Sequence, residues 1–201
     1  MSDENPRQVT VNTSYTPPSV WLTPRTWTRR DSEFFISNDP ALLSIQAVKK
    51  AHESGFLYWA TTPIPEEVIQ QMLYGSMSFG VYKRSLFRPS NELATPSADD
   101  TEQIGLARAM TDGATFAYLS DVYVLPEYQG KGLGRWLVEC IAEIFSKENM
   151  PYLRRIMLIT GDEHIQEFYA KILNMKVIGH EARPDLGRDL AFLCARPNAQ
   201  P

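Results

Sequence analysis

Three glycines at alternate positions form the stretch of this sequence with the clearest chemical potential. They are Gly130, Gly132 and Gly134. Glycine lets the backbone approach a ligand closely, and free N–H groups at the start of a helix attract anions. Lys131 and Arg135 add positive charge of the kind that favours a pyrophosphate. The stretch is therefore a candidate phosphate site, although a glycine-rich turn that only starts a helix has the same composition.

Two common nucleotide motifs fit this stretch poorly. The phosphate-binding loop of nucleoside triphosphatases has Ser or Thr directly after its Lys to hold magnesium, whereas Gly132 follows Lys131 here. The dinucleotide fingerprint has the spacing Gly-x-Gly-x-x-Gly near the start of a βαβ unit. The glycines of this chain alternate and lie past its middle.

The apolar runs on both sides indicate which elements would hold the glycines. Residues 114–125 are rich in aromatic and β-branched side chains and predict a long, mostly buried strand that ends before Pro126. After the glycines, apolar residues recur at helical spacing and predict a helix with one buried face. They are Leu133, Trp136, Leu137, Cys140, Ile141, Ile144 and Phe145.

The segment from Gln129 to Gly134 resembles a known cofactor signature at every fixed position. The signature is that of the GNAT acetyltransferase superfamily for acyl-CoA, Gln or Arg-x-x-Gly-x-Gly or Ala. The run from Leu119 to Tyr128 is similar to the strand that precedes this signature, and residues 33–195 can be read onto the family fold. An aromatic pair, Tyr58-Trp59, ahead of a helix that starts Pro-Glu-Glu resembles a subgroup found in bacteria and fungi.

The resemblance implies a fold and a cofactor. The fold is α/β (α+β), with a twisted, mixed and mostly antiparallel sheet, one splayed parallel strand pair and about four flanking helices. The cofactor is acetyl-CoA, whose pantetheine arm would lie between the splayed strands. The residues expected to bind coenzyme A are Val122, Tyr123, Val124, Gln129, Gly130, Lys131, Gly132, Leu133, Gly134, Arg135, Asp162 and Phe168. For Asp162, a helix N-cap is the simpler alternative.

Catalytic and acceptor-binding residues can be named in the same way. Tyr169 resembles a tyrosine that lies near the thioester sulfur in the family, where a phenol could give a proton to the departing thiolate. Asp121 lies in an apolar strand, where a carboxylate needs a partner or a cationic substrate, so it is a candidate base. The acceptor is expected to contact Tyr58, Trp59 and Phe79. For Asp121 a hydrogen bond to a neighbouring strand or loop is the alternative, and for Tyr58 and Trp59 it is core packing.

Composition and charge narrow the class of protein further. The chain has 201 residues, of which 43% are hydrophobic and 22% charged, which is typical of one globular domain. Its net charge of −4 argues against general nucleic-acid binding. The lack of an apolar run of about 18 residues argues against a membrane span. Three histidines and two cysteines without ligand spacing predict no metal site. A cytoplasmic protein is expected, and a homodimer is one arrangement that the sequence allows.

The chain divides into two parts by composition. Residues 1–32 are expected to form a partly disordered extension, and residues 33–197 the acetyltransferase domain. In the extension, Trp21 and Trp27 are expected to cover an apolar patch of the domain or of a second subunit.

Other elements follow from periodicity and from turn signals. The pattern predicts helices at 40–54, 65–74 and 163–173, a half-buried strand at 77–81, a flexible insertion at 83–101, and strands at 103–110, 155–160, 177–178 and 190–195. The strand at 155–160 is expected to be buried on both faces and parallel to the strand at 114–125.

The residues and the resemblance together predict an enzyme. It would transfer an acetyl group from acetyl-CoA to the primary amine of a small-molecule or amino-acid-like acceptor, by direct attack on the thioester. Acetylation of proteins or peptides is the alternative activity, and a non-catalytic CoA-binding module is the alternative class.

Overall fold

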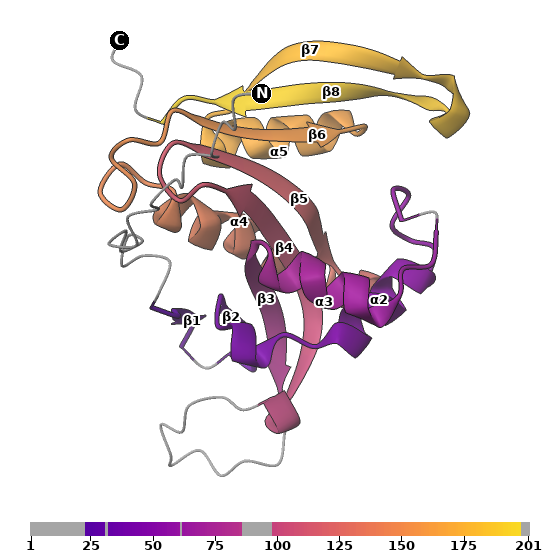
Figure 1. The fold of residues 1–201 in the computed structure, drawn as a ribbon, viewed down its shortest axis with the longest axis vertical. Coiled ribbons are helices and arrows are strands. Elements are labelled where there is room, and N and C mark those ends of the chain that lie inside the picture. Colours follow the sequence, from indigo (N-terminus) through magenta and orange to yellow (C-terminus); the bar gives the residue numbers. More distant parts are fainter. Residues whose placement is uncertain (1–22, 31, 61, 86–97, 198–201) are drawn as a thin grey trace, which may run out of the picture.

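The computed structural model describes residues 23–30, 32–60, 62–85 and 98–197. An eight-stranded sheet has the order β1-β2-β3-β4-β5-β6-β8-β7, and only β5 and β6 pair in parallel among the described strands (Figure 1). The strands are β1 Thr26–Thr28, β2 Phe34–Ser37, β3 Met77–Arg84, β4 Thr101–Thr111, β5 Phe116–Val124, β6 Arg155–Thr160, β7 Lys176–Arg183 and β8 Arg188–Ala195. The predicted mixed, mostly antiparallel sheet is confirmed.

Helices cover the two faces of this sheet. They are α2 Ile45–Glu53, α3 Glu66–Tyr74, α4 Leu133–Ile144 and α5 Glu163–Leu173. The pair α2 and α3 packs over β4 and β5 through a small core that includes Val48, Ile69, Leu106 and Tyr123. On the opposite face, α4 and α5 share a larger core with the strands (Figure 1). The apolar stripe predicted for α4 is buried in that core.

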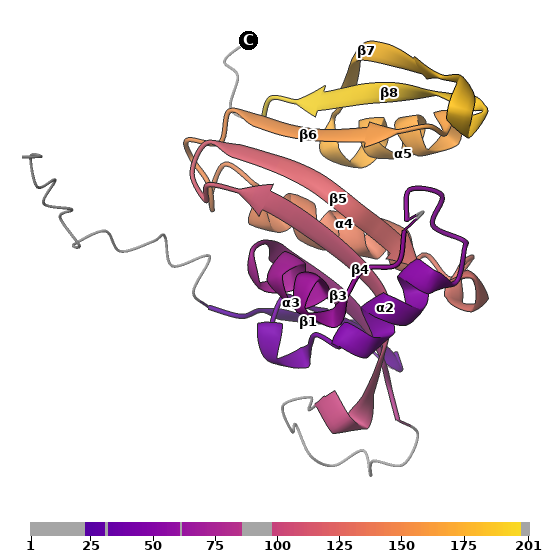
Figure 2. The same ribbon diagram turned by 45° about the vertical axis from the view of Figure 1, so that its right-hand side comes forward.

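The parallel strands stay together over only a short distance. Phe116, Ala117 and Tyr118 of β5 pair with Arg155, Ile156 and Met157 of β6, and the register ends there. Beyond Tyr118 the two strands diverge, so that β6, β8, β7 and α5 form a layer set apart from β5 (Figure 2). The predicted splayed pair is therefore present, and the carboxyl-terminal half of β5 leads directly toward the glycine-rich stretch.

Two helix boundaries show how local chemistry sets the chain path. The single helix predicted at 40–54 is wrong, because Asp39 caps a short 3₁₀ turn over Pro40–Leu42 and Ser44 then caps α2 by accepting from the N–H of Ala47. At the end of α5, Asn174 adopts φ 52°, the left-handed conformation that usually calls for glycine.

The described part of the amino-terminal extension belongs to the sheet. Thr26–Thr28 pairs with β2, and Trp27 packs on the core with its ring centroid 6.2 Å from that of Phe79. The Nε1 of Trp27 donates to Oε2 of Glu143 on α4 over 2.8 Å. Trp27 therefore covers an apolar patch of the domain, as predicted, whereas Trp21 lies outside the described residues.

Two predictions of strand burial were wrong. Residues Met77–Tyr82 of β3 are buried on both faces, because α3 and α4 both contact this strand. In β6, by contrast, the side chain of Ile159 is 37% exposed, since its face of the strand points away from the core shared by α4 and α5. Of the predicted insertion at 83–101, residues 86–97 lie outside the described residues.

The turn between β4 and β5 fixes the start of the strand that leads to the glycines. Oδ1 of Asp112 accepts from the N–H groups of Ala114, Thr115 and Phe116, at 3.0, 2.7 and 3.1 Å, and Oδ2 accepts from Oγ1 of Thr115 at 2.6 Å. Burial of the carboxyl opposes ionisation, but these hydrogen bonds outweigh it and hold the pKa of Asp112 well below its usual range.

We expect Asp112→Ala to lower the melting temperature at pH 7 by roughly 2–4 °C, which corresponds to about 1 kcal/mol of lost hydrogen bonding. Because the folded pKa is depressed, this stabilisation is present above the unfolded pKa of about 3.9 and is lost as the pH falls below it. The difference between variant and wild type should shrink below pH 4 in thermal melts. Asp185→Ala, which breaks an exposed ion pair with Arg183, is the control and should change the melting temperature less.

Candidate active site

The glycine-rich stretch forms an open turn at the amino terminus of α4. Gly130 and Gly132 have φ values of 76° and 74°, and Gly132 is the N-cap residue with no side chain to satisfy the first N–H groups of the helix. A Cβ atom built at either glycine would meet nothing within 4 Å. The free N–H groups of the first turn of α4 thus face open space that an anion could occupy.

Side chains around this turn fix it to the sheet and set its charge. The Nε2 of Gln129 donates to the carbonyl of Val124 over 2.9 Å, which ties the turn to the end of β5. Arg135 is exposed and its Nε donates to Oε1 of Glu139 over 2.8 Å, so much of its charge is already balanced. Lys131 is exposed and makes no ion pair with a carboxylate of the described residues. It is the better placed of the two predicted cations to meet a phosphate.

A bulge interrupts β5 next to its diverging edge. Leu106 of β4 pairs with Tyr123, but Arg108, two residues on, pairs with Ser120, so β5 contains one extra residue. Asp121 lies in this bulge with φ 51°, a left-handed conformation that costs a non-glycine residue about 1 kcal/mol or more. Such a bulge re-aims a side chain, and here it turns the Asp121 carboxylate toward α3 and the segment before it.

The carboxylate of Asp121 has two firm partners. Its Oδ2 accepts from Nε of Arg108 over 2.6 Å, and its Oδ1 accepts from Nε1 of Trp59 over 3.1 Å. Arg108 is held in turn by the carbonyl of Met72 and the hydroxyl of Ser76. The sequence required a partner for this buried acid, and Arg108 on the neighbouring strand supplies it. Since both oxygens already accept hydrogen bonds, Asp121 is better suited to hold a group than to take up a proton.

Three tyrosines come together where β5 and β6 separate. Tyr169 of α5 is 6% exposed, and burial followed by the nearby Tyr58 raises its pKa. Tyr118 of β5 is half-buried, and its pKa is raised by burial, then by Asp121 and Tyr58. Tyr58 therefore acts electrostatically on both hydroxyls, and its ring centroid is 4.9 Å from that of Trp59. The segment between α2 and α3 thus reaches the carboxyl-terminal layer of the fold.

A cation closes this tyrosine cluster from the opposite side. The guanidinium carbon of Arg188, at the start of β8, lies 4.5 Å from the ring centroid of Tyr58. The aliphatic part of Arg188 crosses Gly161, where a Cβ would approach its Cδ to 2.5 Å. A side chain at position 161 would therefore displace Arg188 from this path. No carboxylate of the described residues forms an ion pair with Arg188.

Three further residues predicted for the site have different surroundings in the structure. Phe168 is half-buried and packs edge-on against Tyr169, with ring centroids 5.2 Å apart, so it lies at the tyrosine cluster. Oδ1 of Asp162 accepts from the N–H groups of His164 and Ile165, as the N-cap alternative predicted. Phe79 has no exposed surface and packs with Trp27 on the α4 side of the sheet, which makes it a core residue and removes it from the acceptor site.

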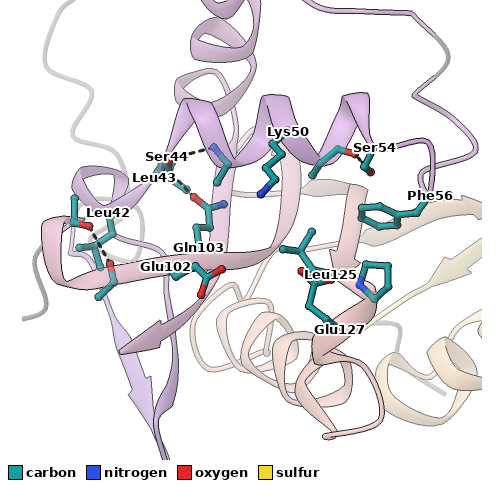
Figure 3. A pocket seen from close by; sticks show the side chains of 15 residues that line it. Leu42, Leu43, Ser44, Lys50, Ser54, Phe56, Glu102, Gln103, Leu125 and Glu127 are labelled. Carbon is teal, nitrogen blue, oxygen red and sulfur yellow. Dashed lines mark hydrogen bonds between the residues drawn. The ribbon is translucent and has the colours of Figure 1, made fainter. Parts of the chain in front are cut away.

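A groove of about 640 Å³ lies between α2, the start of β4 and the segment that enters the glycine turn (Figure 3). Leu43, Phe56 and Leu125 give it apolar walls, while Lys50 and Glu127 border it. None of the residues predicted for the site lines this groove. The groove shares no lining residue with the tyrosine cluster or the glycine turn, so it is not taken as the acceptor site.

Sequence reasoning missed the residues that complete this region. Arg188 and His52 lie far from Asp121 in sequence, Arg108 lies on the neighbouring strand of the same hairpin, and none belongs to a recognisable motif. One signal was available for Arg108, because an arginine in the apolar run at 104–110 needs a buried counter-charge as Asp121 does. Among the described residues there is no cluster of His, Cys, Asp or Glu that could hold a metal ion. No helix in the described part of the chain is long and apolar enough to cross a membrane.

Comparison with known proteins links this geometry to a family. A family model described as an acetyltransferase (GNAT) domain matches residues 97–172. A Gibberella zeae protein whose name assigns it provisionally to the acetyltransferases is 39% identical over 155 residues, covering 76% of this chain and 84% of that protein. A crystal structure from Xanthomonas campestris pv. campestris, assigned to the GNAT family, is 30% identical with a TM-score of 0.51, covering 70% of this chain and 82% of that chain.

A more distant structure shares the fold alone. Arabidopsis thaliana NAA60 in complex with acetyl-CoA has a TM-score of 0.54 at 13% identity, over 87% of this chain and 99% of that chain.

If the glycine turn holds the pyrophosphate of coenzyme A, Gly132→Ala should weaken acetyl-CoA binding by tenfold or more and abolish most of the rise in melting temperature that the ligand causes. Gly55→Ala is the matched control, because Gly55 also has positive φ and open surroundings but lies after α2, outside the proposed phosphate site. Each alanine should cost about 1 kcal/mol in the unliganded protein. Equal losses of affinity in both variants would show that the helix terminus is not the phosphate site.

Proposed function

Because the chain belongs to the GNAT acetyltransferase family, we propose that it transfers an acetyl group from acetyl-CoA to the primary amine of a small, amino-acid-like acceptor. The observation that supports this most strongly is the early end of the β5–β6 pairing. Beyond Tyr118 the edge of β5 has no strand partner among the described residues, and it runs into a turn built for an anion.

The proposed path of the cofactor follows from that edge. Backbone N–H and C=O groups of a strand need partners, and an extended ligand can supply them as an added strand would. The pantetheine arm has amide groups suited to this pairing with Val122, Tyr123 and Val124. Its pyrophosphate would then lie at Gly130–Gly134, with Lys131 beside it, and its thioester at the tyrosine cluster.

The reaction needs a neutral amine and a way to hold charge on the departing sulfur. The amine nitrogen forms a bond to the thioester carbon, the C–S bond breaks, and the proton lost by the acylated nitrogen ends on the sulfur. Burial raises the pKa of Tyr169, which keeps its hydroxyl protonated but makes it a weaker acid than a free phenol. Its proposed role is therefore a hydrogen bond to the developing thiolate rather than full proton transfer.

Electrostatics at the tyrosine cluster favour one class of acceptor. Asp121 is neutralised by Arg108, whereas Arg188 has no paired carboxylate among the described residues and sits over Tyr58. The uncompensated charge at the site is thus positive, so it favours an amine that also bears a carboxylate and disfavours a polyamine. Trp59 and Tyr58 would provide the apolar walls around the acceptor, and Trp59 is 41% exposed there.

We expect the wild-type protein to release free thiol from acetyl-CoA when offered a panel of amino acids and simple amines. Tyr169→Phe should lower kcat by about tenfold or more while acetyl-CoA affinity stays within about twofold, because the lost hydrogen bond forms only as the sulfur leaves. Unchanged kcat would remove Tyr169 from the mechanism. Cofactor binding without thiol release from any amine, peptides included, would instead favour a non-catalytic CoA-binding module.

Arg188→Gln should raise KM for carboxylate-bearing acceptors by about tenfold, because a charge-assisted bond to the acceptor is lost, and should leave KM for their amide or decarboxylated analogues nearly unchanged. Arg183→Gln is the matched control. Arg183 pairs directly with Arg188 in the β7–β8 register, but its guanidinium is bound to Asp185. An equal effect of Arg188→Gln on charged and uncharged acceptors would contradict the proposed specificity.

A further inference from the structure

A buried histidine at the end of α2 has no hydrogen-bond partner among the described residues. His52 lies in the last turn of α2 and is 7% exposed, and neither Nδ1 nor Nε2 has a partner in the described part of the structure. A buried polar group left unpaired costs about 1–3 kcal/mol, so native proteins nearly always pair such groups with protein atoms or with water. A water molecule bound to a ring nitrogen would satisfy this need of His52.

The surroundings of His52 combine an apolar shell with one ion pair. Apolar side chains of α2, α3 and β5, including Val48, Ile69 and Tyr123, form the core around this part of α2. The charged groups that act on the imidazole are Asp121 of β5 and Arg108 of β4. Burial lowers the pKa of His52, Asp121 opposes that shift, and Arg108 adds to it, so the imidazole is neutral at pH 7.

The neutral imidazole of His52 and the hydrogen-bonded carboxylate of Asp121 differ in their ability to accept a proton. Both oxygens of Asp121 already accept hydrogen bonds, from Arg108 and Trp59. A neutral imidazole always has one nitrogen with a free lone pair, and that of His52 is unused by the protein. Trp59 connects the two environments, because its ring is partly exposed at the acceptor segment and its Nε1 reaches Asp121. The group able to accept a proton here is thus His52 rather than Asp121.

We propose that His52 receives the proton that the acceptor ammonium loses before it attacks the thioester, through a water molecule held between the imidazole and Asp121. This inference rests on the proposed acetyltransferase function. In the step, one N–H bond of the ammonium breaks, the water passes a proton on, and the unprotonated ring nitrogen of His52 gains it. The positive charge of the imidazolium then faces Asp121, and the proton returns to solvent before the next cycle. His52 does not touch the acceptor and is a positioning residue for the proton.

The sharpest test compares acceptors whose amines differ in basicity. His52→Gln should lower kcat/KM by about 100-fold for acceptors that are ammonium ions at pH 7, and by much less for weakly basic amines that arrive already neutral. In the wild type, kcat/KM should rise with pH below pH 6.5, which gives the pH profile an acid limb. This limb should disappear in His52→Gln. His180→Gln, on exposed β7, is the matched control and should leave the limb in place.

The outcomes separate this inference from the proposed function. If His52→Gln lowers kcat/KM equally for basic and weakly basic amines, or keeps the acid limb, the proposed role of His52 is wrong. Acetyl transfer by the wild-type protein would not be affected by that result. Absence of thiol release in the wild type with every amine would overturn the proposed function itself. If His52→Gln fails to fold, an NMR titration of the wild-type ring decides the matter, since a ring pKa at or above 6.5 contradicts a neutral, buried proton acceptor.

Discussion

The short parallel contact between β5 and β6 is the constraint on which the rest of the arrangement depends. Three residue pairs and a hydrogen bond from the N–H of Arg154 to the carbonyl of Thr115 join β5 to β6 and thereby the two halves of the sheet, and among the described residues the strand pairing ends at Tyr118. Leu137 and Ile141 of α4 share one core with Leu158 and Leu193 of the carboxyl-terminal layer, which keeps the halves in place where backbone hydrogen bonds stop. Because a strand edge without a partner can pair with an extended ligand, the proposed cofactor path follows this gap in the pairing.

The ion pair of Arg108 with Asp121 holds together the part of the site formed by the bulge in β5, α3 and the segment that contains Trp59. Both side chains are nearly buried, at 11% and 7% exposure, so removal of either would leave an uncompensated charge at a cost of about 3–5 kcal/mol. The pair also supports the left-handed backbone of Asp121, which would otherwise be unfavourable. Through Met72 and Trp59 it joins α3 and the acceptor segment to the bulge. One interaction thus orders three parts of the chain around the same point.

Much of the local structure could be foreseen, and the errors share a cause. The glycine turn, α4 and the cap at Asp162 follow from turn chemistry and apolar spacing, which act within a few residues. The helix at 40–54 was predicted as one piece because Asp39 and Pro40 give a start signal, but Ser44 gives a second, and capping energies alone do not rank them. Phe79 was assigned to an acceptor site although it is core, since periodicity shows that a face is buried without showing what covers it.

The sequence by itself determined the family resemblance, the mixed sheet with a splayed parallel pair that it implies, the glycine-rich turn and the need of Asp121 for a partner, because these depend on residue type and short-range spacing. Only the tertiary structure decided which residues contact Asp121 and Tyr58. Arg108 and Trp59 both bind Asp121 at the bulge in β5. Arg188 lies over the ring of Tyr58, and the charges of Asp121 and Arg108 act on His52. Contacts between residues this far apart in sequence depend on packing of whole elements, and no local pattern encodes that packing.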